Sequence, residues 1–196
     1  MHLVFDIFQG IGIAAAVGIR PFLPTLAVGA LAAGNVELHF DHTKLAFLQS
    51  GPFLLGVVLL AILLALAERR FNVDRLEDGP GALVLAAASF ALGALLFAGS
   101  LARGHYAVWP GVIAGIACAA VGILATRPLF ARVRSRLDAA SAAAIPVYAE
   151  GLAVGLAALS VVAPPVGPIA LAALIWLIVA GRRRQGQKYA GLRILR

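Results

Sequence analysis

Charged side chains are scarce in this sequence, and cysteine is nearly absent. Only 13% of the 196 residues are charged, and the single cysteine, Cys118, excludes an intrachain disulfide. Hydrophobic residues make up 62% of the chain. A soluble domain cannot build a polar surface from such a composition. The composition therefore predicts an integral membrane protein.

Uncharged intervals long enough to cross a bilayer recur along the chain. Each reaches the roughly 20 apolar residues that a spanning helix needs. The last interval, 139–181, is interrupted only by Glu150, and its cluster VVAPPVGP at 161–168 cannot continue a helix, so we expect a hairpin there. The sequence thus predicts a single domain, residues 1–196, folded as an all-α polytopic bundle of six membrane-spanning helices. The expected spans are residues 7–33, 45–67, 80–102, 106–126, 140–162 and 166–181, followed by a basic tail at 182–196.

The distribution of basic residues tests this count, because each added or lost span would move every later loop to the other side. Thirteen of the sixteen Lys and Arg residues fall in one set of alternate loops and the tail, two fall in the other set, and Arg20 lies within a span. We therefore expect both termini in the cytoplasm and the protein in the inner (plasma) membrane. Anionic lipids attract such basic segments, so the net charge of +7 requires no nucleic acid. The tail residues expected to bind lipid headgroups are Arg182, Arg183, Arg184, Lys188 and Arg193.

Few residues outside the spans indicate chemistry. The loop NVELHFDHTK at 35–44 contains side chains of metal-ligand type, but ligands this close together in a polar loop define no coordination geometry. Motifs for phosphate binding, paired-histidine zinc sites and nucleophilic catalysis are missing. We therefore expect no metal, no cofactor, no catalytic residue and no enzyme activity. Small residues at helix-contact spacing, such as Gly151 and Gly155, favour packing within the chain, with a homo-oligomer as the alternative.

The segment GIRPFLP at 18–24 places Arg20 inside an apolar run. An arginine at the centre of a spanning helix costs roughly 2.5–3.5 kcal/mol, so it usually faces protein or water and has a partner. Arg20 lies about 20 Å along a helix from Ile7, and Glu150 lies about 15 Å into its own span. The two spans run in the same direction. The sequence therefore predicts an Arg20–Glu150 ion pair near the midplane.

Two prolines add a break to this charged position. Pro21 and Pro24 remove the donors that the carbonyls of Val17 and Arg20 would use, so the first span is expected to break between Arg20 and Pro24. Non-helical backbone at this depth needs protein or a wet cavity around it. A broken helix with buried charges is typical of midplane solute sites in transporters. The residues expected to form such a site are Gly18, Arg20, Pro21, Pro24 and Glu150.

Two functions are compatible with this site. In the first, the protein binds or translocates a small solute or ion, with Arg20 holding negative charge and Glu150 acting as its counter-ion or as a proton-coupled switch. In the second, the ion pair only fixes the register of two helices. The protein would then be a structural, assembly or lipid-interacting subunit that transports nothing.

Four stretches of the chain resemble a known family. They are GIRPFLPTLAVGAL from Gly18, AERRFNVDRLEDGPGAL from Ala67, YAEGLAVGLAAL from Tyr148 and KYAGLRILR from Lys188. Over nearly its whole length the chain is similar to the bacterial membrane proteins catalogued as domain of unknown function 4126. The resemblance implies a multi-pass inner-membrane protein, an acidic residue at position 150, and no established activity, substrate or cofactor. Some members carry Asn-Ala-Tyr where this chain has Arg20-Pro21-Phe22, so the resemblance does not imply an arginine here.

Overall fold

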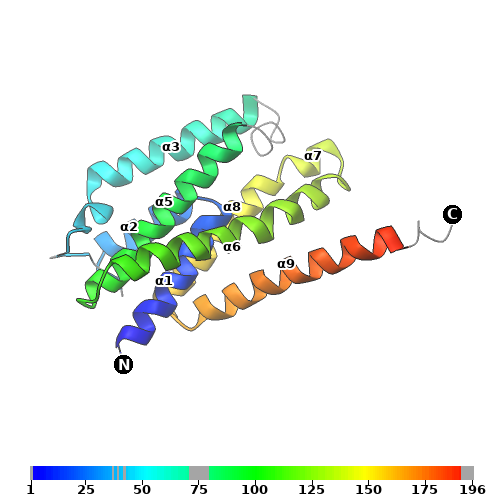
Figure 1. Cartoon of the computed structure of the whole chain (residues 1–196). Helices are drawn as coiled ribbons and strands as arrows, with labels where there is room; N and C mark the ends of the chain where they lie inside the picture. The colour runs from blue at the N-terminus through cyan, green and yellow to red at the C-terminus, as the bar shows by residue number, and fades with distance from the viewer. Residues whose placement is uncertain (1, 37, 39, 42, 71–79, 191–196) are drawn as a thin grey trace.

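The protein is a bundle of helices in the computed structural model, which describes residues 2–36, 38, 40–41, 43–70 and 80–190 (Figure 1). These residues include no strand. In chain order the helices are α1 (His2–Ile19), α2 (Phe22–Ala33), the 3₁₀ helix η1 (Ala46–Gln49), α3 (Gly51–Arg70), α5 (Pro80–Arg103), α6 (Trp109–Arg134), α7 (Ala139–Ala142), α8 (Ile145–Val162) and α9 (Val166–Ala190).

Five of these helices, α3, α5, α6, α8 and α9, are long and apolar enough to cross a membrane. Two shorter apolar helices, α1 and α2, form the first apolar run of the sequence. This arrangement confirms the prediction of an all-α polytopic membrane bundle. The hairpin predicted at the Pro/Gly cluster is also present, because α8 ends at Val162 and α9 begins at Val166.

The first apolar run breaks at Arg20, as predicted. Arg20 N–H makes the last bond of α1, to the Ala16 carbonyl, and the chain bends at Pro21 before α2 begins. Neither Pro21 nor Pro24 can donate the bond that would continue α1. Both prolines instead stand at the start of α2, where the missing N–H has no intrahelical acceptor to lose.

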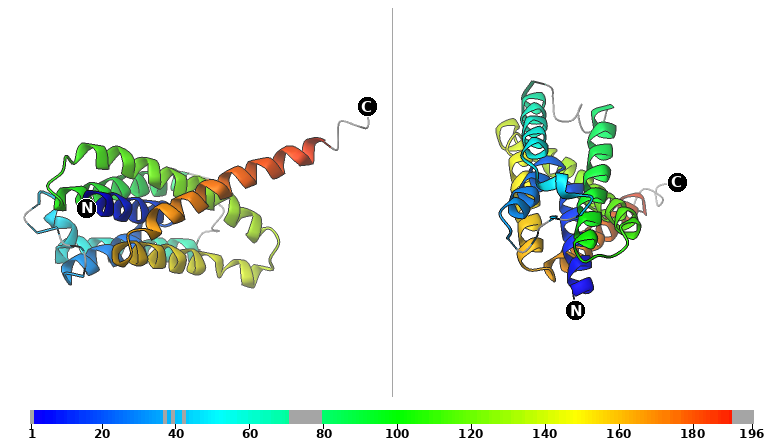
Figure 2. Two further views of the ribbon diagram at one scale, coloured as in Figure 1. Left: turned by 90° about the horizontal axis from the view of Figure 1, so that it is seen from below. Right: turned by 90° about the vertical axis from the view of Figure 1, so that its left-hand side faces the viewer.

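The break reverses the chain instead of kinking one span. The end of α1 meets the end of α3, where Arg20 contacts Glu68. The second half of α2 lies beside the start of α3, since a Cβ built on Gly29 would be 2.4 Å from Leu54. Hence α2 runs back toward the end of the bundle from which α1 came (Figure 2).

The two ends of the bundle differ in charge. We call one the basic end, since α3 finishes there with Arg70 and α6 passes through Arg127 to Arg134. The other, the opposite end, contains the turns from α5 to α6 and from α8 to α9. There Asp6, 2% exposed near the start of α1, is ion-paired with Arg103 at the end of α5.

The sequence led us to expect both termini on the cytoplasmic side, whereas the reversal places them at different ends of the bundle. The N-terminus lies at the opposite end, whereas α9 carries the C-terminal part of the chain beyond the basic end (Figures 1 and 2). Because the extra pass precedes the first loop, every later loop keeps the side that its basic residues predicted. Only the N-terminus lies at a different end of the bundle from the one expected. Arg20 also lies at the basic end, where the loops rich in basic residues are found.

Several predicted span boundaries also shift, and at two of them a proline lies in the first turn of the helix. The span expected at 45–67 is helical from Gly51, with Pro52 in the first turn, and is preceded by η1. The span expected at 140–162 divides into α7 and α8, with Pro146 in the first turn of α8. In both cases proline is tolerated at a helix start, where its absent N–H costs no helical bond.

Helix α1 is the centre of the bundle and packs against α5, α6, α8 and α9. Its residues Ile13 to Val17 are fully buried. Glycine lets the backbones of α1 and α6 approach closely: a Cβ on Gly18 would lie 2.2 Å from the Ala119 carbonyl oxygen, and one on Gly122 would lie 2.4 Å from that of Ala15. Such small-residue contacts hold helices together where lipid removes the hydrophobic driving force.

A buried glutamine fastens α1 to the end of α8. Gln9 Nε2 donates to the Val161 carbonyl at 3.1 Å, and Gln9 is 1% exposed. In a continuing helix this carbonyl would accept from the residue four positions later, which is Pro165 and has no N–H. Gln9 therefore satisfies a carbonyl that the Pro/Gly turn leaves without a helical donor.

Candidate functional site

Arg20 is paired with a carboxylate at the basic end. Its Nη1 donates to Glu68 Oε1 at 2.5 Å, and the two side chains are 7% and 15% exposed. The ion-pair partner of Arg20 is thus Glu68, and the Glu150 carboxylate expected from the sequence interacts with Arg20 electrostatically. Treating residues 7–33 as one broken span that crosses the membrane once had placed Arg20 at mid-depth. The reversal instead places it beside the last turns of α3.

This pair does not lie at the midplane. Glu68 is about 26 Å along α3 from Gly51, and Arg20 follows the 18 residues, about 27 Å, of α1. The hydrocarbon core of a bilayer is roughly 30 Å thick. Helix α8 begins with Ile145 at the basic end, and Glu150 lies about 8 Å along it. All three charged groups thus lie in the part of the bundle nearest the basic end.

Glu150 lies close to the ion pair without completing it. It interacts electrostatically with both Arg20 and Glu68. Its Oε2 atom is buried and accepts no hydrogen bond from the described residues. A buried carboxylate oxygen without a donor is costly, so this atom is the least satisfied part of the charged group.

A hollow of about 350 Å³ lies between α2, α3 and α8, beside Glu150. Among the residues that the structure describes, the charged ones that line it are Glu68 and Glu150, at its basic end. The remaining lining residues are apolar: Leu23, Leu26, Val58, Ala61, Ile62, Leu64, Ala65, Pro146 and Val147. Ile62 and Val147 are 51% and 71% exposed, so the hollow opens sideways between α3 and α8. A volume of this size falls within the roughly 300–1,000 Å³ of small-molecule sites.

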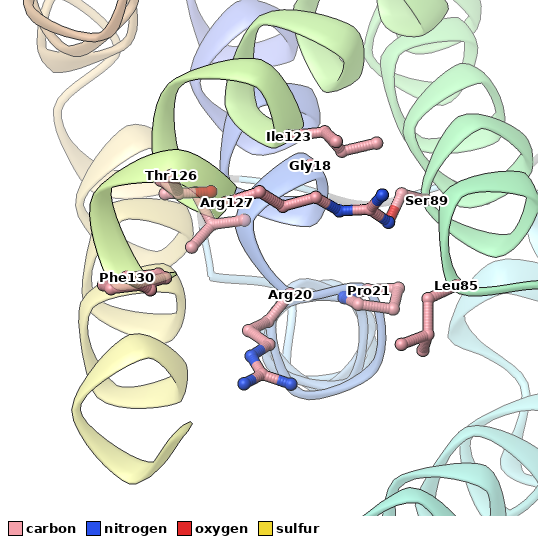
Figure 3. Close-up of a pocket in the computed structure, with 10 residues that line it drawn as sticks. Gly18, Arg20, Pro21, Leu85, Ser89, Ile123, Thr126, Arg127 and Phe130 are labelled. Atoms are coloured by element: carbon pink, nitrogen blue, oxygen red, sulfur yellow. The ribbon is translucent and has the colours of Figure 1, made fainter. Parts of the chain in front are cut away.

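A second, much smaller hollow of about 40 Å³ lies on the other side of the α1–α2 junction (Figure 3). Gly18, Arg20 and Pro21 line it together with residues of α5 and α6. In Figure 3 the Arg127 side chain extends across the hollow toward Ser89, while the guanidinium of Arg20 points away from it. Arg127 also donates to the Ala82 carbonyl of α5 at 2.9 Å. This region holds about one water-sized space and mainly joins three helices.

The predicted site residues therefore separate into two groups. Glu150 lines the larger hollow, and Arg20 is paired with Glu68, another of its lining residues. Gly18 and Pro21 line the smaller hollow, where Gly18 also allows close packing on α6. Pro24 is buried in the first turn of α2 and belongs to the lining of neither.

Sequence reasoning missed Glu68 as a site residue, since it belongs to the segment ERRFNVDRLEDG, whose acidic and basic side chains nearly balance. A signal was present in the sequence. Glu68 is the first charged residue after the apolar run 45–67, so it is confined to the mouth of that span. To predict that Arg20 lies at the same end of that span, Pro21 and Pro24 would have had to be interpreted as a reversal of the chain.

The remaining predicted residues lie away from the hollow. Arg182 and Arg183 are exposed on α9, and Arg184 and Lys188 belong to the same helix. Arg193 lies outside the described residues, as do Glu37, His39 and His42 of the 35–44 loop. Asp41 accepts a hydrogen bond from Gln49. Among the described residues, no group of three His, Cys, Asp or Glu side chains could hold a metal ion.

A bundle of apolar helices with an ion pair and an unsatisfied carboxylate oxygen buried toward one end defines a polytopic helical membrane protein. The chain belongs to the family described as Domain of unknown function (DUF4126), whose model matches residues 7–184. The match extends from α1 into α9 and includes Arg20, Glu68 and Glu150. It confirms the family suggested by the sequence motifs. Searches of curated proteins and of solved structures gave no match.

Proposed function

We propose that this membrane protein binds a small, membrane-soluble molecule in the hollow between α2, α3 and α8. The observation that carries the proposal is the Oε2 atom of Glu150, which is buried at the polar end of an apolar hollow and has no hydrogen-bond partner among the described residues. An apolar pocket with a few convergent polar groups is the usual form of a small-molecule site. A ligand would supply the interaction that Glu150 lacks.

In this proposal Arg20 positions the site and does not bind the ligand itself. Its guanidinium contacts Glu68, and the larger hollow is lined by the two carboxylates without Arg20. An anionic ligand would therefore meet Glu68 and Glu150 first and be repelled. The hollow and the unsatisfied oxygen favour binding over the alternative of a purely structural subunit, which would need neither.

The proposed location is the cytoplasmic membrane of a bacterium, with the basic end toward the cytoplasm. The described arginines at that end support this orientation through the positive-inside rule. Anionic lipid headgroups are the proposed partners of the tail residues Arg182, Arg183, Arg184, Lys188 and Arg193, at about 1 kcal/mol for each basic residue near the surface. Changing Arg182 and Arg183 to Gln should reduce the anionic lipid retained in native mass spectra, whereas Lys44→Gln, at the opposite end, should not.

The binding proposal is tested by asking whether a small apolar molecule reaches Glu150 from the membrane. Dicyclohexylcarbodiimide dissolves in lipid and adds to protonated carboxyl groups. In phosphatidylcholine nanodiscs, peptide mass spectrometry should find the adduct on Glu150. Ala61→Phe should fill the hollow and suppress the reaction. Leu63→Phe, on the same helix but outside the lining and 60% exposed, should leave it unchanged.

The result that would overturn the proposal is equally specific. Glu150 that stays unmodified in the wild type, or that reacts equally in Ala61→Phe and Leu63→Phe, would show that the hollow admits no such molecule. Thermal unfolding of each variant identifies any loss of reaction caused by misfolding. A third variant, Ala65→Leu, fills the hollow from another position if Ala61→Phe does not fold.

A further inference from the structure

Resting on the proposed function, we infer that the hollow between α2, α3 and α8 selects an ammonium-bearing amphipathic molecule, which enters sideways from the bilayer and places its ammonium group against Glu150. The relevant chemistry is an aliphatic ammonium group attached to an apolar chain. Such a group occurs both in free lipophilic amines and in lipids with an amine headgroup.

The charges that face the hollow support a cation. Glu68 shares its Oε1 with Arg20, whereas Glu150 Oε2 is buried without a hydrogen-bond partner among the described residues. In the described part of the chain, one guanidinium therefore lies beside two carboxylates. An ammonium group would provide the missing positive charge and, in a primary amine, the missing hydrogen-bond donors. A sulfate or phosphate group would add negative charge to the same region.

The shape of the hollow supports an attached apolar chain. Apart from the two carboxylates, the described residues of its lining are apolar, and on α3 it extends from Glu68 to Val58, about 15 Å of helix. Leu23 and Leu26 of α2 form another part of the lining. A small inorganic cation would leave this apolar length empty, whereas an alkyl chain would occupy it.

The position of the hollow supports entry from the bilayer. Helix α3 packs mainly against α2 and η1, and just 6% of the residues in its apolar span are buried within the bundle. The hollow opens between α3 and α8, where Ile62 and Val147 are exposed. The carboxylates lie near the basic end, at the depth where the charged head of an amphipathic molecule meets the membrane surface. The charged head of such a molecule would therefore lie against the carboxylates, and its chain would lie against the apolar lining.

The inference is tested by protection of Glu150 from dicyclohexylcarbodiimide in phosphatidylcholine nanodiscs. The probes are dodecyltrimethylammonium, dodecanol and dodecyl sulfate, which share one chain and differ in the charge of the head. A quaternary ammonium is used because it cannot react with the activated carboxyl group. We expect dodecyltrimethylammonium to protect at a concentration roughly tenfold or more below that of dodecanol, with dodecyl sulfate weakest. Equal protection by dodecanol or dodecyl sulfate would overturn the inference and leave binding in the hollow intact.

The two sources of the ammonium group are separated by lipid composition. Nanodiscs that contain phosphatidylethanolamine should suppress the reaction without any added probe if the ligand is a membrane lipid. Suppression only by the added ammonium compound identifies a free amine as the ligand class. If neither phosphatidylethanolamine nor the added ammonium compound suppresses the reaction, the inference is overturned. Failure of the carbodiimide to reach Glu150 at all would instead contradict the proposed function, so the two failures are distinguishable.

Direct binding of radiolabelled dodecyltrimethylammonium provides a second readout. Glu150→Gln should weaken it by roughly tenfold or more, because the amide removes the charge and keeps the size of the side chain. Glu150→Asp, which restores a carboxylate, should recover part of the affinity. Gly151→Ala is the matched control, since a Cβ there meets no atom within 4 Å. Unchanged binding in a folded Glu150→Gln variant would overturn the inference.

Discussion

Arg20, at the end of α1, and Glu68, near the end of α3, form a buried ion pair between the central helix of the bundle and a peripheral one. Helix α3 otherwise packs mainly against α2 and η1. The pair therefore fixes the basic end of α3, and with it one wall of the larger hollow. Losing either partner would affect the fold and the hollow together.

Removing the guanidinium should be more damaging than neutralising its partner. Arg20→Met should destabilise the protein by about 3–5 kcal/mol, because it leaves Glu68 and Glu150 as unpaired neighbouring carboxylates. Glu68→Gln should cost less, about 1–3 kcal/mol, because the amide oxygen can still accept from Arg20. Unfolding in mixed detergent micelles measures both changes. Arg70→Gln, exposed at the same end, is the control and should have little effect.

A double-mutant cycle identifies which carboxylate is the partner of Arg20. The coupling free energy between Arg20→Met and Glu68→Gln should exceed that between Arg20→Met and Glu150→Gln. A larger coupling with Glu150 would restore the pairing expected from the sequence and contradict the geometry described above.

The two termini should be accessible from different sides of the membrane. With Cys118 replaced by Ala, a single cysteine placed before Met1 should react with a membrane-impermeant maleimide from the side that also labels Tyr106→Cys. Arg183→Cys should react only from the other side. Labelling of intact and permeabilised cells measures this directly. Reaction of the N-terminal cysteine together with Arg183→Cys would contradict the reversal at Arg20.

Most of the fold follows from the sequence, because apolar length, loop charge and proline clusters act locally. The breaks at Arg20 and at the Pro/Gly cluster depend on donors that particular prolines lack, and both were predictable from those residues. The direction of α2 was not. Proline ends a helix without specifying where the chain goes next. That direction depends on contacts such as Gly29 with Leu54, which join segments distant in sequence.

The candidate site was predictable only in part for the same reason. Glu150 stood out because it is a lone carboxylate inside an apolar run. Glu68 was missed as its neighbour because an error in the direction of one short helix placed Arg20 near the midplane and not at the basic end. The apolar wall of the hollow comes from three helices whose individual residues, such as Leu26 and Ala61, look like ordinary lipid-facing or packing positions.

Glycines of the α1–α6 contact should tolerate no added methyl group. Gly122→Ala would place a Cβ 2.4 Å from the Ala15 carbonyl oxygen, so the two helices must move apart. Overpacking of this kind typically costs about 1–3 kcal/mol. Gly151→Ala, in open space on α8, should instead be neutral or stabilising by up to about 1 kcal/mol, because alanine favours helix. Thermal unfolding of the two variants should therefore shift in different directions or by clearly different amounts.

Gln9 should stabilise the turn between α8 and α9 from a distance of 152 positions in the sequence. Gln9→Leu keeps much of the side-chain volume but removes the donor to the Val161 carbonyl, which Pro165 cannot replace. A buried carbonyl left without a donor should cost about 1–3 kcal/mol. The loss should appear as faster hydrogen exchange in the last turn of α8 and as a lower unfolding temperature. Ser50→Ala, which removes a hydrogen bond at an exposed position, is the control. Equal stability of Gln9→Leu and the wild type would show that the Val161 carbonyl finds another donor and that α1 is held to α8 by packing alone.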